Sequence, residues 1–168
     1  MIREAATDDI NSITSIITKV WKKEVFTSKN YPNILMELKY NENKYTKNLT
    51  KEINFNLIKA FVYEENNKIA GFISGKLRLA EYDSEIIEFY VDPDFHNKGI
   101  GLKLFNKMVS YFKKNNRKKL ILWAFNIPKI NEFYNKHGGI EKKYKEIILG
   151  NKKYTEVGFC FNIGWPDQ

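Results

Sequence analysis

The segment from Glu85 to Gly101 constrains the fold of this chain more than any other part of the sequence. Residues 85–91 have the apolar composition of a buried β-strand, and Asp92-Pro93 follows as a turn. A loop with glycine at positions 99 and 101 then opens directly into an amphipathic helix. This order places free backbone N–H groups at a helix N-terminus, where the helix dipole also favours anions. The segment therefore predicts a site for a phosphate-bearing ligand.

The remaining pattern predicts a mixed α/β domain, with helices and strands alternating in the middle and antiparallel hairpins at the sides. Strands are expected at residues 2–5, 58–64, 68–79, 85–91, 120–125, 140–149 and 154–163. Helices are expected up to residue 23 after a cap at Thr7 or Asp8, and at 100–114 and 128–136. Residues 33–51 are expected to be helical or irregular, and Gly150-Asn151 is expected to be a hairpin turn. The strand–helix–strand unit at 85–125 implies one parallel strand pair with a right-handed crossover.

Length and composition exclude several classes of protein. A chain of 168 residues with 43% hydrophobic residues is expected to fold as one domain over residues 1–168. No apolar run is long enough to span a bilayer, and the single cysteine, Cys160, fits a reducing cytoplasm. One cysteine and two histidines predict no metal site. The net charge of +8 admits nucleic acid as a partner, and the basic run at 113–119 is either a solvated helix end or a binding patch.

The sequence of the loop narrows the range of possible ligands. A dinucleotide fingerprint needs a third glycine and a P-loop needs Gly-Lys-Ser/Thr, and the segment His96-Asn97-Lys98-Gly99-Ile100-Gly101 has neither. The segment resembles the acetyl-CoA-binding motif of the GNAT family of N-acetyltransferases, Gln/Arg-x-x-Gly-x-Gly/Ala. Residues 120–123 and 131–139 resemble a later strand of that family and its "Phe-Tyr-Glu-Lys-x-Gly" helix, and residues 2–9 resemble its opening. The resemblance covers nearly the whole chain.

Membership of this family implies a mostly antiparallel central sheet with a parallel, splayed strand pair, flanked by helices. It also implies acetyl-CoA as co-substrate. The pyrophosphate would bind loop N–H groups with help from lysine side chains, and pantetheine would pair with the exposed edge of the strand before the loop. Asn126 lies one residue further from Tyr134 than the family's frequent cofactor-binding asparagine, and Asn131 is the alternative. The residues expected at the cofactor are Phe89, Tyr90, Val91, His96, Asn97, Lys98, Gly99, Ile100, Gly101, Leu102, Lys103, Asn126, Asn131 and Tyr134.

The resemblance also implies the catalytic groups. Tyr134 matches the tyrosine that commonly protonates the departing thiolate, and its alternative role is that of a core aromatic. Glu85 is the first candidate for the base and Glu88 the second. A regular strand would point these two glutamates to opposite faces, and a bulge, usual in this strand of the family, would change that. His96 stands where the family has Gln or Arg, so a side-chain contact from that position is not implied.

The function expected from the sequence is acetyl transfer to a primary amine of a small molecule or protein, by direct attack in a ternary complex. Two alternatives remain open: a non-catalytic acyl-CoA-binding module, and an acetyltransferase acting on a nucleic-acid-linked amine such as aminoacyl-tRNA. The acceptor, the length of the acyl donor and the choice between monomer and homodimer are not readable from the sequence.

Overall fold

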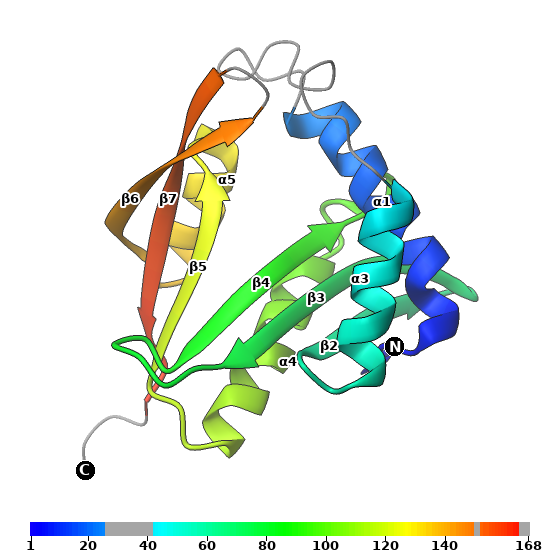
Figure 1. Cartoon of the computed structure of the whole chain (residues 1–168), viewed down its shortest axis with the longest axis horizontal. Helices are drawn as coiled ribbons and strands as arrows, with labels where there is room; N and C mark the ends of the chain where they lie inside the picture. Colours follow the sequence, from blue (N-terminus) through cyan, green and yellow to red (C-terminus); the bar gives the residue numbers. More distant parts are fainter. Residues whose placement is uncertain (26–41, 150–151, 165–168) are drawn as a thin grey trace.

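The computed structural model describes residues 1–25, 42–149 and 152–164 (Figure 1). Within these residues seven strands form one mixed sheet in the order β1-β2-β3-β4-β5-β7-β6. The strands are β1 (Ile2–Glu4), β2 (Lys59–Glu65), β3 (Lys68–Leu77), β4 (Ser84–Val91), β5 (Lys119–Phe125), β6 (Ile140–Leu149) and β7 (Lys152–Asn162). The α-helices are α1 (Ile10–Val20), α3 (Glu42–Asn54), α4 (Ile100–Lys114) and α5 (Pro128–Lys136). Short turns of 3₁₀ helix cover Thr7–Asp9 and Pro93–Phe95, and a π-helical turn covers Trp21–Val25.

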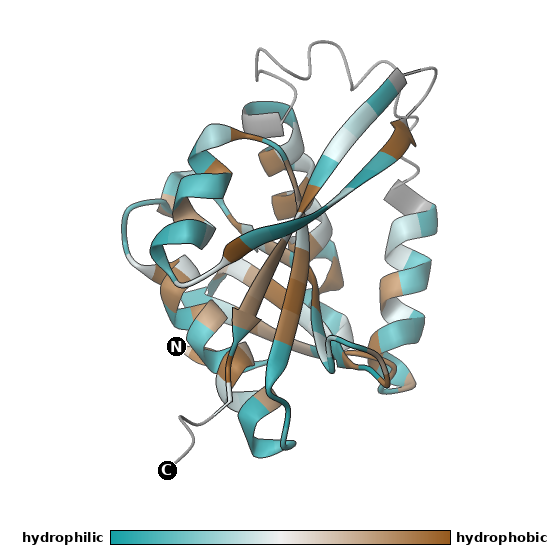
Figure 2. Ribbon diagram, turned by 90° about the vertical axis from the view of Figure 1, so that its left-hand side faces the viewer, coloured by the Kyte–Doolittle hydropathy of each residue, from teal (hydrophilic) through white to brown (hydrophobic). Residues whose placement is uncertain are grey.

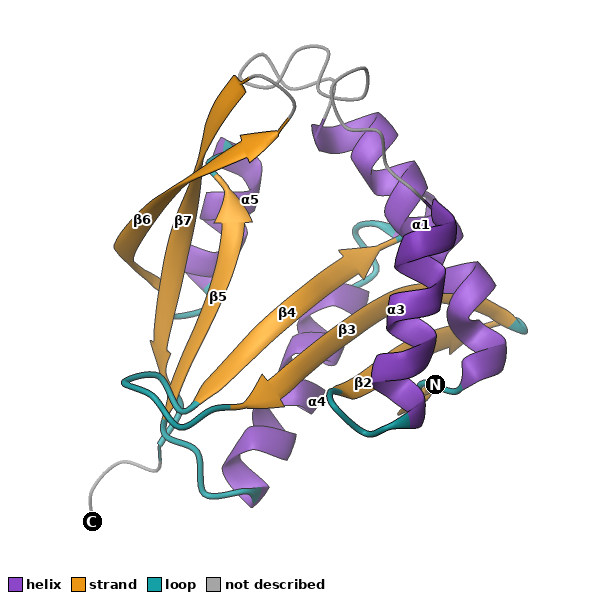
Figure 3. Ribbon diagram, in the orientation of Figure 1, coloured by secondary structure: helices purple, strands orange, loops and turns teal. Residues whose placement is uncertain are grey.

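The pairing of the strands confirms the expected fold class. β4 and β5 are parallel, and every other pair of neighbours in the described sheet is antiparallel. The parallel pairing joins only Ser84–Ile86 to Leu120–Leu122, although β4 continues to Val91 and β5 to Phe125. Beyond Ile86 the two strands diverge, as Figures 1 and 3 show. The expected splayed pair is therefore present, and one edge of β4 is left without a neighbouring strand.

Helices cover both faces of the sheet (Figure 3). The inner side of α4 packs on one face, where Leu104, Met108 and Phe112 are fully buried, and Tyr134 of α5 joins the same cluster. α1 and α3 cover the opposite face of β2, β3 and β4 through Ile13, Leu49 and a second hydrophobic cluster. Hydrophobic residues accordingly colour the central strands, and polar residues colour the outer turns of the helices (Figure 2). We call these surfaces the α4 face and the α3 face of the sheet.

The strands expected at 58–64 and 68–79 and the helix expected at 128–136 are present, and their ends have clear stereochemical reasons. Asn66 and Asn67 both have positive φ (51° and 59°), as a tight hairpin turn between β2 and β3 requires. Pro128 occupies the first turn of α5, where its missing N–H costs no hydrogen bond. Gly138 follows the end of the same helix with φ of +89°. These signals depend on backbone geometry alone, so they can be read directly from the sequence.

The N-terminal cap differs from the prediction. Neither Thr7 nor Asp8 caps the first helix; the carboxylate of Asp9 instead accepts the N–H of Ala6 at 2.8 Å. Arg3 donates to both oxygens of the same carboxylate, and this pair of hydrogen bonds lowers the pKa of Asp9. Asp9 is the N-cap residue of α1 but makes no side-chain hydrogen bond to the helix, because its carboxylate is held by Arg3, six residues earlier, and by the N–H of Ala6.

The predicted stretch 33–51 lies partly outside the described residues. Its later part is helical in α3, and the part up to residue 41 is not described. The expected turn at Gly150-Asn151 also lies outside the described residues, although β6 and β7 pair antiparallel up to its two sides.

Candidate active site

The free edge of β4 is the first element of the site. The N–H of Asp92 donates to the carbonyl of Ala70 across the antiparallel pair with β3, and Tyr90 pairs with Phe72 in the same register. Alternate residues of an antiparallel strand direct their backbone groups to opposite edges. The backbone N–H and C=O groups of Phe89 and Val91 therefore face the open edge, whereas those of Tyr90 face β3. Of the three β4 residues expected at the cofactor, Phe89, Tyr90 and Val91, only Tyr90 directs its backbone groups away from the open edge.

A β-bulge decides which way the two glutamates point. Glu88 pairs with Ser74 and Ile86 pairs with Gly75, so Ile87 is an extra residue in β4. Beyond the bulge, alternation restarts one residue later, and both Glu85 and Glu88 lie on the α3 face. Ile86 and Phe89 pack on the α4 face. A regular strand would have separated the two carboxylates.

The loop after β4 presents a row of unsatisfied N–H groups. Asn97 (φ 62°) and Gly99 (φ 70°) adopt left-handed conformations that turn the chain sharply into α4. Within the described residues no backbone N–H from Asn97 to Leu102 donates a hydrogen bond, whereas the N–H of Lys103 bonds to the carbonyl of Gly99. Such a row, at the N-terminus of a helix with 15 residues, is a strong site for an anion.

The charged side chains of this loop are engaged elsewhere. The Nε2–H of His96 donates to the carbonyl of Val91 at 3.0 Å, so this ring connects the loop to the end of β4. Lys98 forms an ion pair with Glu65 at 3.2 Å, and the Nζ of Lys103 lies 5.5 Å from the centre of the Tyr63 ring. The N–H groups of the loop, rather than these side chains, are therefore available to an anion.

Tyr134 lies beside the free edge of β4 on the α4 face. Its ring centre is 6.5 Å from that of Phe89 and 4.9 Å from that of Phe159. Burial raises the pKa of the Tyr134 hydroxyl well above its usual value, so the hydroxyl stays protonated at neutral pH. No hydrogen bond to this hydroxyl is formed by the part of the chain that the structure describes. It is a proton donor without a protein acceptor.

The two asparagines after β5 form a pair. The Nδ2 group of Asn131 donates to the Oδ1 of Asn126 at 2.7 Å. The Oδ1 of Asn131 is buried and has no hydrogen-bond partner among the described residues. A buried acceptor without a partner is costly unless a ligand or water satisfies it. Asn131 therefore has a free acceptor group that a ligand could use, and Asn126 holds its side chain in place.

The two candidate bases differ sharply in environment. Glu85 forms ion pairs with Lys76 at 3.4 Å and Arg78 at 3.0 Å, beside the paired part of β4 and β5. Glu88 lies next to the bulge, where the strands have separated, and burial raises its pKa to about 7. A carboxylate with a pKa near 7 suits proton abstraction at neutral pH better than one held by two cations. The environment of Glu88 therefore suits a base better than that of Glu85, which was the first candidate from the sequence.

Sequence reasoning missed two aromatic residues that approach this site. The hydroxyl of Tyr45, in α3, donates to Glu88 at 2.6 Å. The indole N–H of Trp21 donates to the Tyr90 hydroxyl at 3.2 Å, and its ring meets Phe125 edge-on at 5.6 Å, so Trp21 links the separated ends of β4 and β5. The helical spacing marks Trp21 only as a core residue, and nothing near Tyr45 in the sequence indicates its partner.

Comparison with known proteins fits this geometry. Residues 57–138 match the family model of the acetyltransferase (GNAT) domain; this range includes β4, the loop, α4, β5 and all of α5. A protein of Methanocaldococcus jannaschii described as an uncharacterized N-acetyltransferase is 39% identical over 97 residues. Residues 57–138 belong to the GNAT superfamily. The alignment with the relative covers 54% of this chain and 41% of that protein, so the chain spans less than half of the relative's length.

Solved GNAT structures share the fold. A GCN5-related N-acetyltransferase from Rhodopseudomonas palustris superposes with a TM-score of 0.75 at 16% identity, covering 96% of this chain and 94% of that one. The PaiA N-acetyltransferase of Thermoplasma acidophilum, solved in complex with coenzyme A, gives a TM-score of 0.70 at 20% identity over 96% and 98% of the two chains. Within the described residues of this chain, no helix is long and apolar enough to cross a membrane, and no cluster of side chains has the composition of a metal site.

Proposed function

We propose that this protein is an acetyl-CoA-dependent N-acetyltransferase that moves an acetyl group to a primary amine by direct attack in a ternary complex. The observation that carries the proposal is the free edge of β4 leading into six consecutive unsatisfied N–H groups, from Asn97 to Leu102. An extended ligand with a polar amide arm and an anionic end matches such a surface. Coenzyme A, with its pantetheine and pyrophosphate, has this chemistry, and a neighbour with the same fold was solved with coenzyme A bound.

The residues present fit this co-substrate. The N–H groups from Asn97 to Leu102 would hold the pyrophosphate, and the free edge at Phe89 and the N–H of Val91 would pair with pantetheine. The unpaired Oδ1 of Asn131, which lies in the helix that follows β5, offers a hydrogen-bond acceptor from the β5 side of the region where β4 and β5 separate. The Val91 carbonyl is already bonded to His96 and would not take part.

The positions of Glu88 and Tyr134 support direct attack. The two side chains lie on opposite faces of the sheet, beside the region where β4 and β5 have separated. A thioester placed across this gap would be reached from the α3 face by the amine and Glu88, and from the α4 face by Tyr134. Neither side chain would have to move through the sheet.

The proposed reaction balances with these two groups. The neutral amine nitrogen attacks the thioester carbonyl carbon, forming the C–N bond, and the carbon–sulfur bond then breaks. Glu88 accepts the proton that the amine nitrogen loses, and the hydroxyl of Tyr134 donates a proton to the departing thiolate. Backbone N–H groups at the free edge of β4 would stabilise the oxyanion that forms in between.

The acceptor is proposed as a primary amine of a small molecule or a protein. The alternative of a nucleic-acid-linked amine rests on the net charge and on the basic residues 113–119. Those residues lie at the C-terminal end of α4, and the 15 residues of that helix separate them from the anion site by about 22 Å. The distance favours a solvated helix end over a patch that guides an acceptor to the site.

The decisive experiment is a thiol-release assay with acetyl-CoA against a panel of small primary amines and N-terminal peptides. We expect thiol release from acetyl-CoA that depends on the presence of at least one of these amines. Binding of acetyl-CoA in calorimetry, without thiol release for any amine, would instead establish a non-catalytic acyl-CoA-binding module. Acceptance only of aminoacyl-tRNA, with strong salt dependence, would favour the nucleic-acid-linked alternative.

We also infer that residues 1–168 form one domain, because every described strand from β1 to β7 belongs to a single sheet. A cytoplasmic location is the corresponding proposal for the compartment. It rests on the single cysteine, Cys160, which is buried and has no partner for a disulfide within the chain.

A further inference from the structure

Glu88 has polar partners that reach it from two neighbouring elements. The hydroxyl of Tyr45 in α3 donates to Oε1 at 2.6 Å, and the hydroxyl of Ser74 in β3 lies 3.5 Å from Oε2. Glu52, also in α3, adds a negative charge near the same carboxylate. Glu85, on the same strand as Glu88, is paired with Lys76 and Arg78, so its negative charge is neutralised. The side chains of α3 are therefore the main electrostatic influence on the carboxylate of Glu88.

We propose that α3 sets the protonation of Glu88 through two side chains that act in opposite directions: Tyr45 holds the carboxylate form, and Glu52 opposes it. Tyr45 and Glu52 are thus positioning residues for the proposed base rather than catalytic residues. The inference rests on the proposed function only for its consequence in catalysis; the effect on Glu88 itself does not depend on any activity.

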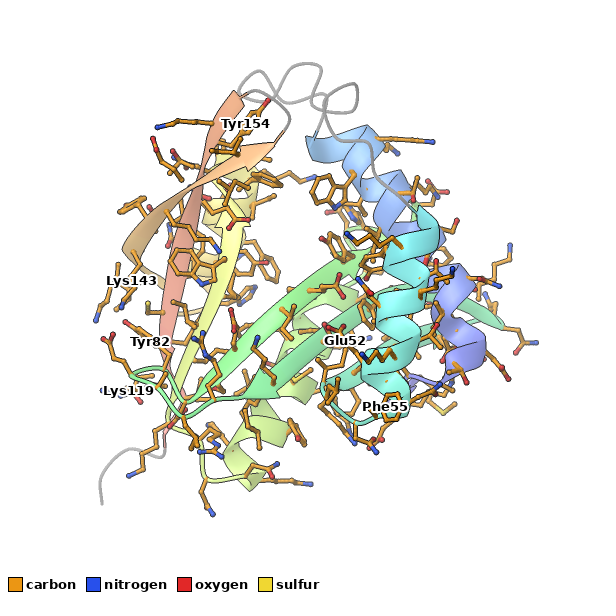
Figure 4. The ribbon with its side chains drawn as sticks, in the orientation of Figure 1. Glu52, Phe55, Tyr82, Lys119, Lys143 and Tyr154 are labelled. Carbon is orange, nitrogen blue, oxygen red and sulfur yellow. The ribbon has the colours of Figure 1, made fainter. Side chains whose placement is uncertain are left out.

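The spacing along α3 places both side chains toward the sheet. Tyr45, Leu49 and Glu52 follow each other at intervals of four and three residues, which is one stripe of an α-helix. Leu49 in the middle of the stripe is 1% exposed and packs with Phe72 of β3. Figure 4 shows Glu52 on the side of α3 that faces the strands. A core contact therefore fixes the orientation of the two polar residues on either side of it.

The two effects have opposite signs for physical reasons. Burial is the largest influence and raises the pKa of Glu88, because a charged carboxylate loses hydration. The hydrogen bond from Tyr45 stabilises the charged form and lowers this pKa, whereas repulsion from the charge of Glu52 raises it. The carboxylate of Glu52 forms no ion pair with any lysine or arginine of the described residues. In a chain with net charge +8, an acidic side chain that has no basic partner and lies near a buried carboxylate is unusual.

The test uses two nearly isosteric variants and the pH dependence of kcat/KM. Tyr45→Phe removes the donor, and we expect the acidic limb of the profile to move up by about one pH unit. Glu52→Gln removes the charge, and we expect the same limb to move down by about half a unit. Tyr144→Phe and Glu146→Gln, both at exposed positions of β6, make the same chemical changes away from Glu88 and should leave the limb unchanged. Shifts of the same sign for both α3 variants would overturn the inference.

A direct titration separates this inference from the proposed function. The ionisation of Glu88 is followed by carboxyl carbon NMR in the protein without substrates, with Glu88→Gln used to assign the signal. Opposite shifts in Tyr45→Phe and Glu52→Gln support the inference even if no acceptor amine is found. An unchanged titration in both variants, at unchanged melting temperature, contradicts it. Opposite shifts in the titration together with full activity of Glu88→Gln would keep the inference and remove Glu88 as the base.

Discussion

The ring of His96 donates its Nε2–H to the carbonyl oxygen of Val91 at 3.0 Å. This bond ties the beginning of the anion-binding loop to the end of β4, on the edge that lacks a neighbouring strand. It fixes the ring in the Nε2–H tautomer, because a carbonyl only accepts. His96 occupies the motif position where the family has Gln or Arg. In this protein it connects the two parts of the proposed cofactor site, the open edge of β4 and the loop.

Removing this link should weaken cofactor binding without disturbing the chemical step. We expect His96→Ala to raise the KM for acetyl-CoA by about threefold to tenfold, the range of one lost hydrogen bond, with little change in kcat. His96→Gln keeps an N–H donor on a side chain of similar reach and should recover part of the loss. Steady-state kinetics with acetyl-CoA as the varied substrate measure both. An equal fall in kcat and kcat/KM would show that His96 acts in the chemical step instead.

The hydroxyl of Tyr134 should matter for catalysis and not for folding. It has no hydrogen-bond partner in the described part of the protein, so Tyr134→Phe should leave the melting temperature unchanged. We expect kcat to fall by about a hundredfold or more, because the departing thiolate loses its proton donor, while acetyl-CoA affinity stays nearly intact. Tyr111→Phe, on α4, is the matched control. An unchanged kcat would remove Tyr134 from the mechanism.

Glu88 should make the protein less stable as the pH rises. Its pKa is about 7 in the folded protein and 4.5 in its ordinary state, so the folded state binds more protons between these values and loses stability as the pH increases through that window. We expect Glu88→Gln to be more stable than the parent protein at pH 8 by about 3 kcal/mol and to differ little at pH 4. Urea unfolding at the two pH values measures the difference.

Glu88→Gln should also abolish the acidic limb in the pH profile of kcat/KM. Glu85→Gln provides the comparison, since Glu85 is paired with Lys76 and Arg78 and is not expected to act as the base. A loss of activity with Glu85→Gln larger than that with Glu88→Gln would return the role of base to Glu85.

The two glycines of the loop should respond differently to alanine. Gly99 has φ of +70° with open space around its Cα, so Gly99→Ala should cost about 1 kcal/mol from backbone strain alone. Gly101 has an ordinary helical φ, and an added Cβ would lie 3.6 Å from Phe89, which is normal van der Waals distance. We therefore expect Gly101→Ala to be nearly neutral for stability, and Gly99→Asn to cost less than Gly99→Ala, because asparagine tolerates this conformation. Thermal unfolding of the three variants compares them; equal losses for both alanine variants would contradict the assignment.

The sequence alone predicted those features that depend on local backbone rules. α4 begins at Ile100 and ends at Lys114 as expected, because a glycine loop precedes an amphipathic stripe. The turn at Asn66-Asn67 and the end of α5 at Gly138 follow from residues that accept positive φ. The start of the first helix was not predictable in this way, because Arg3 holds the carboxylate of Asp9 through a contact outside the helix.

The order of the elements and the glycine loop are thus local properties that can be read from the sequence, and they carry the family resemblance. The environment of the two glutamates, by contrast, depends on the tertiary structure. The extra residue at Ile87 appears only when β4 pairs with β3, and it turns Glu85 and Glu88 to one face. Tyr45 lies 43 residues before Glu88 in the chain and meets it only because Leu49 anchors α3 on the sheet. Strand register and helix docking depend on contacts between distant segments, and such contacts leave no periodic signal in the sequence.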